Sequence, residues 1–209
     1  MLKLDQQIGY STHDKLGQQP EIIELPRQKM AVVHTIGAPD RVMHLVLPAL
    51  YSSVYKLSRN LKRMGKDFRI SHMRVRWPDV HPSTDPEQTL VPEEERHGIW
   101  GLPLPETIAS LPQRVPHVEV EIETWEYGTV AQLIHNGPLS EEGPDIKRLE
   151  DFIAESGYEI TGGLEEEYLV GPEPEIQRTV VRFPVKMQKV TTALGPVNKH
   201  DLMLVGSGA

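Results

Sequence analysis

A run of three glutamates, Glu165 to Glu167, is followed by Tyr168, and these residue types are well suited to chemistry. Glycines precede the run and a Gly-Pro pair follows it, which predicts a short strand over residues 164–170 with a turn at each end. Because side chains alternate across a strand, Glu166 and Tyr168 share one face and the two outer glutamates share the other. On a concave apolar face, Glu166 could recognise a cation or act as a general base.

The same run has a simpler interpretation as the solvated edge of a sheet. Most runs of charge lie on solvent-exposed faces, and spacing alone favours this alternative. We expect Glu165 and Glu167 to face solvent in either case.

Four aromatic residues are candidates for the walls of a site around Glu166. Tyr51 and Tyr55 are one helical turn apart and can face the same space. An aromatic face attracts a cation by about 0.5–2 kcal/mol. Trp77 and Trp100 belong to segments that lead toward the expected cleft. The alternative for all four is ordinary packing, either in the core or between a helix and the sheet.

Metal and cofactor chemistry is not indicated by any motif. His34 and His135 lie at the ends of two predicted strands, without the clustered spacing of metal ligands, and are expected to stabilise turns. The chain has no cysteine. It also lacks a glycine-rich phosphate loop, a Gly-x-Ser-x-Gly elbow and a dinucleotide fingerprint. We therefore expect no metal and no cofactor.

Composition narrows the class of partner. The chain has 209 residues and a formal net charge of −8, which argues against direct binding to nucleic acid and suits a cationic ligand. No apolar run is long enough to cross a membrane, and the N-terminus lacks the apolar segment of a signal peptide. The expected location is the cytoplasm.

Periodicity predicts alternating strands and two long helices. A helical pattern covers 41–64, with its regular part starting at Pro48 and its end at Gly65, and a second helix runs from Pro144 to Gly157. A short helical turn is expected over 106–111, and a surface loop over 78–96. Strands are expected at 21–25, 30–36, 67–70, 73–77, 99–103, 118–125, 129–135, 164–170 and 179–183.

The order of these elements repeats. Each half has two strands, a glycine-containing turn, a helix with a glycine at its end, and two further strands, so His34 and Gly37 correspond to His135 and Gly137. The predicted fold class is α+β, with duplicated βαββ units forming a pseudo-twofold antiparallel sheet, two long helices and a central ligand cleft. The expected boundaries are an N-terminal arm at 1–19, one domain at 20–187 with halves at about 20–104 and 116–187, and a tail at 188–209.

Several segments together resemble the GyrI-like small-molecule-binding family, whose signature is a strand, a His-x-Gly turn, a helix and a Glu-x-Tyr-Leu strand. The resemblance covers about residues 20–187 and is most specific in the second half. The matching segments are Leu133-Ile134-His135-Asn136-Gly137-Pro138, Gly157-Tyr158, Glu165-Glu166-Glu167-Tyr168-Leu169 with Pro172, and Gly101-Leu102-Pro103-Leu104-Pro105.

The resemblance implies a role for Glu166. Some members of this family are effector-binding domains attached to transcription regulators. In these domains the glutamate of Glu-x-Tyr engages cationic aromatic drugs among aromatic side chains. Other members stand alone, and some of that branch hydrolyse the cyclopropane of DNA-alkylating natural products. That branch often carries paired tryptophans after the first helix, where this sequence has Trp77 followed by Pro78.

Three functional hypotheses follow. The first is a stand-alone protein that binds a hydrophobic, aromatic, cationic compound through Glu166, Tyr168, Tyr51, Tyr55, Trp77 and Trp100, for drug or toxin sequestration or transcription-linked sensing through another chain. The second is a hydrolase of strained electrophiles with Glu166 as general base. The third is an inhibitor that binds gyrase. The oligomeric state is left open.

Overall fold

A computed structural model describes residues 19–81, 91–169 and 177–189. The predicted N-terminal arm and C-terminal tail therefore lie almost entirely outside the described residues, as do part of the predicted loop at 78–96 and the Gly-Pro pair after the acidic strand.

Eight of the nine predicted strands are confirmed, with shifts at their ends. The segment 67–70 is not a strand. The short helical turn expected over 106–111 is reduced to one turn at its start, where the Ile108 N–H donates to the Pro105 carbonyl. One short strand, β7, was not predicted. The strands are β1 Glu21–Leu25, β2 Gln28–Ile36, β3 Arg74–Trp77, β4 His97–Pro103, β5 Glu121–Trp125, β6 Gly128–Asn136, β7 Tyr158–Ile160, β8 Leu164–Tyr168 and β9 Arg178–Met187. The helices are α1 Pro39–Arg63 and α2 Gly143–Glu155, with 3-10 turns η1 Glu93–Glu95 and η2 Leu139–Glu141.

Helix α1 begins earlier than predicted. Its first turn contains Pro39, whose fixed φ suits that position, and Pro48 lies inside the helix instead of opening it. Pro48 is exposed, so the carbonyl that loses its partner there can be hydrated, while Val46 and Ala49 beside it are buried. The predicted end is confirmed, because Gly65 has a φ of +73° and Lys66 donates back to the Leu61 carbonyl.

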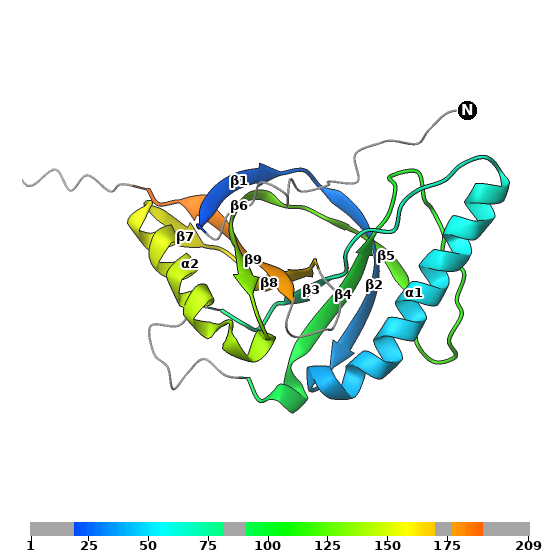
Figure 1. Cartoon of the computed structure of the whole chain (residues 1–209), viewed down its shortest axis with the longest axis horizontal. Coiled ribbons are helices and arrows are strands. Elements are labelled where there is room, and N and C mark those ends of the chain that lie inside the picture. The colour runs from blue at the N-terminus through cyan, green and yellow to red at the C-terminus, as the bar shows by residue number, and fades with distance from the viewer. Residues whose placement is uncertain (1–18, 82–90, 170–176, 190–209) are drawn as a thin grey trace, which may run out of the picture.

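The strands form an antiparallel sheet that curls on itself. Its order is β1-β6-β9-β8-β3-β4-β2-β5, with β7 added to β9 outside this path, so β1 and β5 lie at opposite edges. Yet only Pro26 and Arg27 join β1 to β2, and only Glu126 and Tyr127 join β5 to β6. Such short links require the two edges to approach each other, and the sheet forms a half-barrel (Figure 1).

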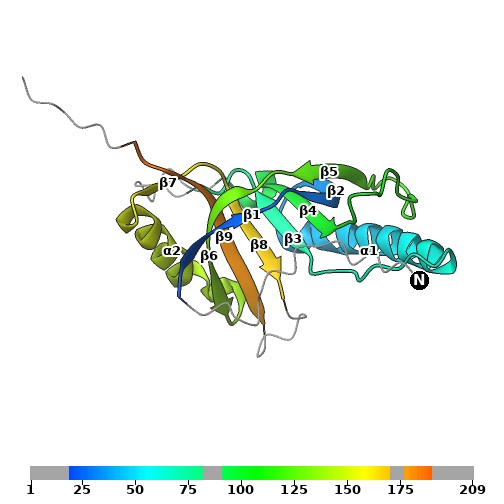
Figure 2. The same cartoon turned by 90° about the horizontal axis from the view of Figure 1, so that it is seen from above.

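The curl gives the sheet two different faces. On the helix face, α1 packs on β2 and β4 while α2 packs on β6 and β7, and Figure 2 shows the helices at opposite ends of the sheet. The main apolar core fills this face. The inner face, which the curl encloses, carries a smaller apolar cluster of Met30, Val32 and Trp125 with Ile99 and Tyr127. In the described part of the chain, neither helix is long and apolar enough to span a membrane.

The duplicated α+β architecture is confirmed. β1, β2, α1, β3 and β4 correspond in order to β5, β6, α2, β8 and β9, and Gly37 and Gly137 follow β2 and β6 with φ values of +138° and +130°. The predicted match between His34 and His135 is wrong by one residue. Register through β4 and β3 places His34 on the inner face, whereas register through β9 and β8 places His135 on the helix face with Tyr168.

Candidate functional site

Glu166 lies in the middle of the sheet, on its helix face. It is only 5% exposed and stands in register between Val75 of β3 and Val181 of β9. The Tyr168 hydroxyl donates a hydrogen bond to the Glu166 carboxylate, as their shared face allows. Burial, and then the nearby Glu166 carboxylate, raise the pKa of Tyr168 well above its ordinary value, so the phenol keeps its proton.

A second carboxyl group, that of Glu142, lies beside Glu166. Glu142, the residue before α2, shares a hydrogen bond with Glu166, and Arg96 is near enough to act on the same carboxyl. Burial first, and then the charge of Glu166, raise the pKa of Glu142 to about 9, which keeps it protonated at neutral pH. Among the described residues, the Glu142 Oε2 atom is buried without a hydrogen-bond partner, and so is Arg96 Nε.

Trp77 and Trp100 form part of the apolar core beneath this carboxyl pair. They are 5% and 0% exposed, and their rings meet edge to face with centroids 5.5 Å apart. Trp100 Nε1 donates to Thr35 Oγ1 at 2.9 Å, and the Arg96 guanidinium lies 5.9 Å from the Trp77 ring centroid. Because both tryptophans are buried, the structure supports the interpretation that they pack in the core.

Tyr51 and Tyr55 lie next to each other on α1, with ring centroids 5.9 Å apart. Tyr51 packs partly against the core, and Tyr55 is 50% exposed. In the described ranges, no hydrogen bond or ring contact joins either tyrosine to Glu166. The structure therefore brings together Glu166, Tyr168 and the newly found Glu142, and separately pairs the two tyrosines.

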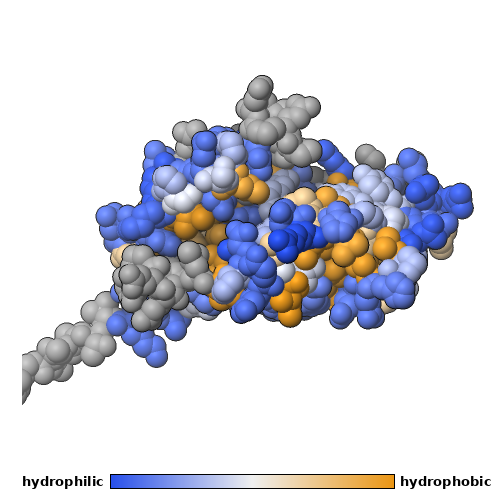
Figure 3. All heavy atoms as spheres, turned by 90° about the horizontal axis from the view of Figure 1, so that it is seen from below, coloured by the Kyte–Doolittle hydropathy of each residue, from blue (hydrophilic) through white to orange (hydrophobic). Residues whose placement is uncertain are grey.

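The end of the molecule at which both helices begin has apolar side chains at its surface. In Figure 1 both helices start at the lower side, and Figure 3 shows, from that side, apolar patches between polar ones. Glu142 directly precedes α2, and Ile36, which is 74% exposed, lies just before α1. Glu142 and Ile36 therefore both lie at the end of the molecule where apolar side chains reach the surface.

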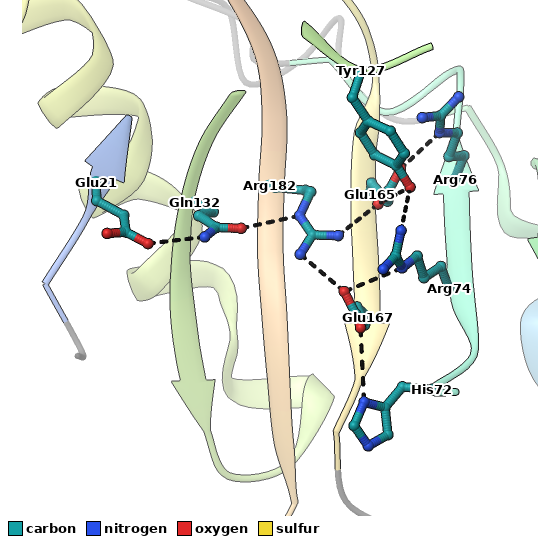
Figure 4. Close-up of polar contacts among 9 residues, drawn as sticks. All are labelled: Glu21, His72, Arg74, Arg76, Tyr127, Gln132, Glu165, Glu167 and Arg182. Atoms are coloured by element: carbon teal, nitrogen blue, oxygen red, sulfur yellow. Dashed lines mark hydrogen bonds and ion pairs between the residues drawn. The ribbon is translucent and has the colours of Figure 1, made fainter. Parts of the chain in front are cut away.

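The expectation that Glu165 and Glu167 face solvent is wrong. They are 3% and 1% exposed, on the inner face, where the arginines of the neighbouring strands surround them (Figure 4). Arg182 reaches Glu165 at 2.8 Å and Glu167 at 3.0 Å, Arg74 reaches Glu167 at 3.2 Å, and Arg76 reaches Glu165 at 2.7 Å.

These ion pairs follow from strand register. Glu165 stands between Arg76 and Arg182, and Glu167 is in register with Arg74. The arginines outweigh the effect of burial and lower the pKa of Glu165, while the glutamates keep Arg74 and Arg182 charged. The sequence contains one signal for this network, because Arg74 and Arg76 are two residues apart on their strand, as Glu165 and Glu167 are on theirs. It does not show which strands are neighbours.

The two histidines singled out in the sequence have different partners. His135 joins the end of β6 to α2, through Asp145 at 2.8 Å and the Pro138 carbonyl at 3.0 Å, so it stabilises the turn as predicted. His34 instead lies 2.6 Å from Glu123 and 3.4 Å from His97. The described residues contain no group of three acidic or histidine side chains placed to hold a metal ion.

Comparison with known proteins identifies the fold. No family model and no curated protein matches this chain. Among solved structures, an uncharacterized conserved protein from Listeria innocua is 21% identical, with a TM-score of 0.71 over 86% of this chain and 98% of its own. A hydrolase from Listeria innocua is 19% identical, with a TM-score of 0.69 over 88% of this chain and 100% of its own. EcmrR, in a complex with DNA, is 12% identical, with a TM-score of 0.53 over 81% of this chain and 57% of its own. At these identities the similarity shows a shared fold.

Proposed function

We propose that this protein is a GyrI-like effector-binding protein that takes a flat, largely apolar, cationic compound on the helix face beside Glu166. The observation that carries the proposal is the carboxyl pair formed by Glu142 and Glu166. Glu166 is buried on the face that the main core fills, and the Glu142 Oε2 atom is buried beside it. Arg96 is near enough to act on Glu142, but within the described ranges neither carboxyl has a hydrogen bond or ion pair to a lysine or arginine.

The energetics of this pair favour a positively charged ligand. Burying a carboxylate without a cation is costly, and here the cost is reduced by keeping a proton on Glu142. A bound cation would offset the same cost and would favour ionisation of Glu142. Binding should therefore release a proton, and the measured heat should depend on the ionisation enthalpy of the buffer.

The apolar surface at the helix starts would supply contacts for a ring system. Tyr55, which is 50% exposed farther along α1, remains a predicted aromatic contact. The proposal keeps the sequence-based expectations of one domain over 20–187 and of a cytoplasmic location. If the protein regulates transcription, its net charge of −8 favours an action through another chain.

The test is calorimetric titration with a planar aromatic cation, 9-aminoacridine, and with acridine at a pH where the ring is uncharged. We expect the cation to bind more tightly, and Glu166→Gln to weaken it by about tenfold or more. Glu155→Gln, an exposed change at the end of α2, is the matched control. Equal binding of the cation to the wild type and to Glu166→Gln would overturn the proposal.

Hydrolysis is the second candidate function, favoured by the same pair. A protonated Glu142 beside Glu166 is a potential acid next to a potential base, the arrangement that many hydrolytic sites use. The name hydrolase belongs to one of the two Listeria innocua proteins described above, and for this chain the argument rests on the carboxyls alone.

Turnover of a compound that carries a strained cyclopropane separates the two functions. A hydrolase would open the ring, and both Glu166→Gln and Glu142→Gln would lower kcat by about a hundredfold or more. Binding without turnover by the wild type would leave ligand binding as the function for that compound.

A further inference from the structure

The inner face of the sheet carries a cavity that the proposed function does not use. Its volume is about 280 Å³, just below the range of pockets that hold drug-sized molecules. Its walls combine apolar and charged side chains from both halves, including Arg76, Ile99, Tyr127, Val130, Glu165 and Pro184. It lies on the opposite side of the sheet from Glu166, because Glu165 and Glu166 point to opposite faces of β8.

The buried hydrogen-bond acceptors of this cavity, on Glu165 and Tyr127, are already occupied. Glu165 Oε1 accepts from the Tyr127 hydroxyl at 3.1 Å and from Arg182 Nη1 at 2.8 Å, while Oε2 accepts from Arg76 Nε at 2.7 Å. The Tyr127 oxygen in turn accepts from Arg74 Nη1 at 2.8 Å. A ligand that needs acceptors would therefore have to break bonds within the network.

Donors, in contrast, remain available on Arg76. Only its Nε atom is engaged, and the described residues provide no hydrogen-bond partner for its two terminal nitrogens. The Arg76 side chain is 27% exposed, and Figure 4 shows the terminal nitrogens turned away from Glu165 and from the rest of the network. Two parallel N–H groups at the end of a guanidinium match the two oxygens of a carboxylate.

Arg76 is also held in one place. Its guanidinium carbon lies 4.1 Å from the Trp125 ring centroid and 4.8 Å from that of Tyr127, while Glu165 fixes Nε. A guanidinium fixed before binding loses little conformational entropy when it receives a ligand. The buried part of the network contains two glutamates and two arginines, so Arg76 adds a positive charge that Glu165 only partly offsets.

We propose that this cavity binds a small organic carboxylate, with the carboxylate on the two terminal nitrogens of Arg76 and an apolar or aromatic body between Ile99, Val130 and Pro184. The other acidic groups nearby are compatible with an anion there. Glu126 is exposed to water at the cavity wall, and Glu21 lies at the far end of the network, beyond Gln132.

The experiment is a titration of the whole chain with phenylacetate and benzoate, followed by calorimetry and by fluorine NMR with 4-fluorobenzoate. Phenylacetamide, benzamide and benzylamine have the same rings without the carboxylate. The carboxylates are expected to bind, and the amides and the amine to bind at least about tenfold more weakly. Arg76→Met should remove carboxylate binding, and Arg76→Lys should retain part of it, because lysine keeps the charge but not the paired donors.

Two further variants keep the test decisive if Arg76→Met fails to fold. Ile99→Phe fills the cavity without changing any charge and is expected to abolish carboxylate binding, whereas Lys186→Met on the exposed part of β9 should leave it unchanged. Three results would each overturn the proposal. The first is equal binding of phenylacetate and phenylacetamide, and the second is no carboxylate binding at millimolar concentration. The third is carboxylate binding that is lost in Glu166→Gln but kept in Arg76→Met. Because 9-aminoacridine reports on the helix face, failure of one site is distinguishable from failure of the other.

Discussion

At the scale of single residues, three consecutive glutamates of β8 have two opposite electrostatic environments. Glu165 and Glu167 face the inner side, where arginines hold them as carboxylates. Glu166 faces the helix side, where it shares a hydrogen bond with a second carboxyl group, that of Glu142, which keeps its proton. Strand alternation alone produces this contrast. Substitutions at neighbouring glutamates of β8 should therefore have different effects on the free energy of unfolding.

Glu142 should make stability depend on pH. Its pKa rises from an ordinary value of 4.5 to about 9 on folding, so between these values the folded state holds one proton more than the unfolded state. The free energy of unfolding therefore falls as pH rises through this window, by at most about 1.4 kcal/mol per pH unit. Glu142→Gln removes this contribution and should gain stability relative to the wild type as pH rises.

Urea unfolding of both proteins at a series of pH values checks this prediction, with Glu155→Gln as an exposed control. A difference between wild type and Glu142→Gln that stays constant with pH would mean that Glu142 is ionised in the folded protein.

Arg182 should be far more important for stability than a charged neighbour on the same strand. Arg182→Met leaves Glu165 and Glu167 buried with fewer partners, and we expect a loss of about 3–5 kcal/mol. Lys186 forms an ion pair with Glu159 at 2.9 Å, but both side chains are largely exposed, so Lys186→Met should cost less than about 1 kcal/mol. Chemical denaturation of the two variants measures both values, and similar losses would contradict the proposed role of the buried network.

At the scale of elements, β8 depends on a close approach at its start. A Cβ atom added at Gly163 would lie 2.1 Å from the Trp77 carbonyl oxygen and 2.8 Å from Pro78 Cα, and neither backbone atom can move without displacing β3. Gly163 therefore permits the pairing of Trp77 with Leu164, which sets the register of all three glutamates.

We predict that Gly163→Ala destabilises the protein by about 1–3 kcal/mol or more. The matched control is Gly143→Ala in the first turn of α2, where an added Cβ meets nothing within 4 Å and stability should change by less than about 1 kcal/mol. Thermal unfolding of the pair provides the comparison, and equal melting temperatures would show that β8 can shift to accommodate the methyl group.

The limits of sequence-based prediction are also clearest at this scale. Strand periodicity and glycine turns are local, so eight of the strands, the alternation of the three glutamates along β8 and the end of α1 could be predicted. The start of α1 could not be predicted, because the burial of Val46 and Ala49 outweighs the unfavourable helix propensity of Pro48. Glu142 was missed because it meets Glu166 only through the position of α2 against the sheet.

At the scale of the whole molecule, both halves share one sheet. β1 of the first half pairs with β6 of the second, and β5 of the second half pairs with β2 of the first. The main core likewise contains residues of α1 and α2 together. We therefore expect a single cooperative unfolding transition, in which neither half unfolds alone.

Tryptophan fluorescence and far-ultraviolet circular dichroism, followed in the same urea titration, test this. The three tryptophans are buried, Trp77 and Trp100 in the first half and Trp125 in the second, whereas circular dichroism reports on all elements. The two curves should have one common midpoint, and two separate midpoints would show that the halves are independent units.

The exchanged pairing of β1 and β5 has a consequence for symmetry. The first half keeps β2, β3, β4 and α1 and donates β1, and the second half keeps β6, β7, β8, β9 and α2 and donates β5. A half expressed by itself would lack one outer strand, unless a second copy supplied it in return. The single chain thus has the topology of a strand-exchanged homodimer joined end to end by the segment between β4 and β5. Its pseudo-twofold axis passes between β3 and β8, so Arg74 and Arg76 of the first half form ion pairs with glutamates of the second half across that axis.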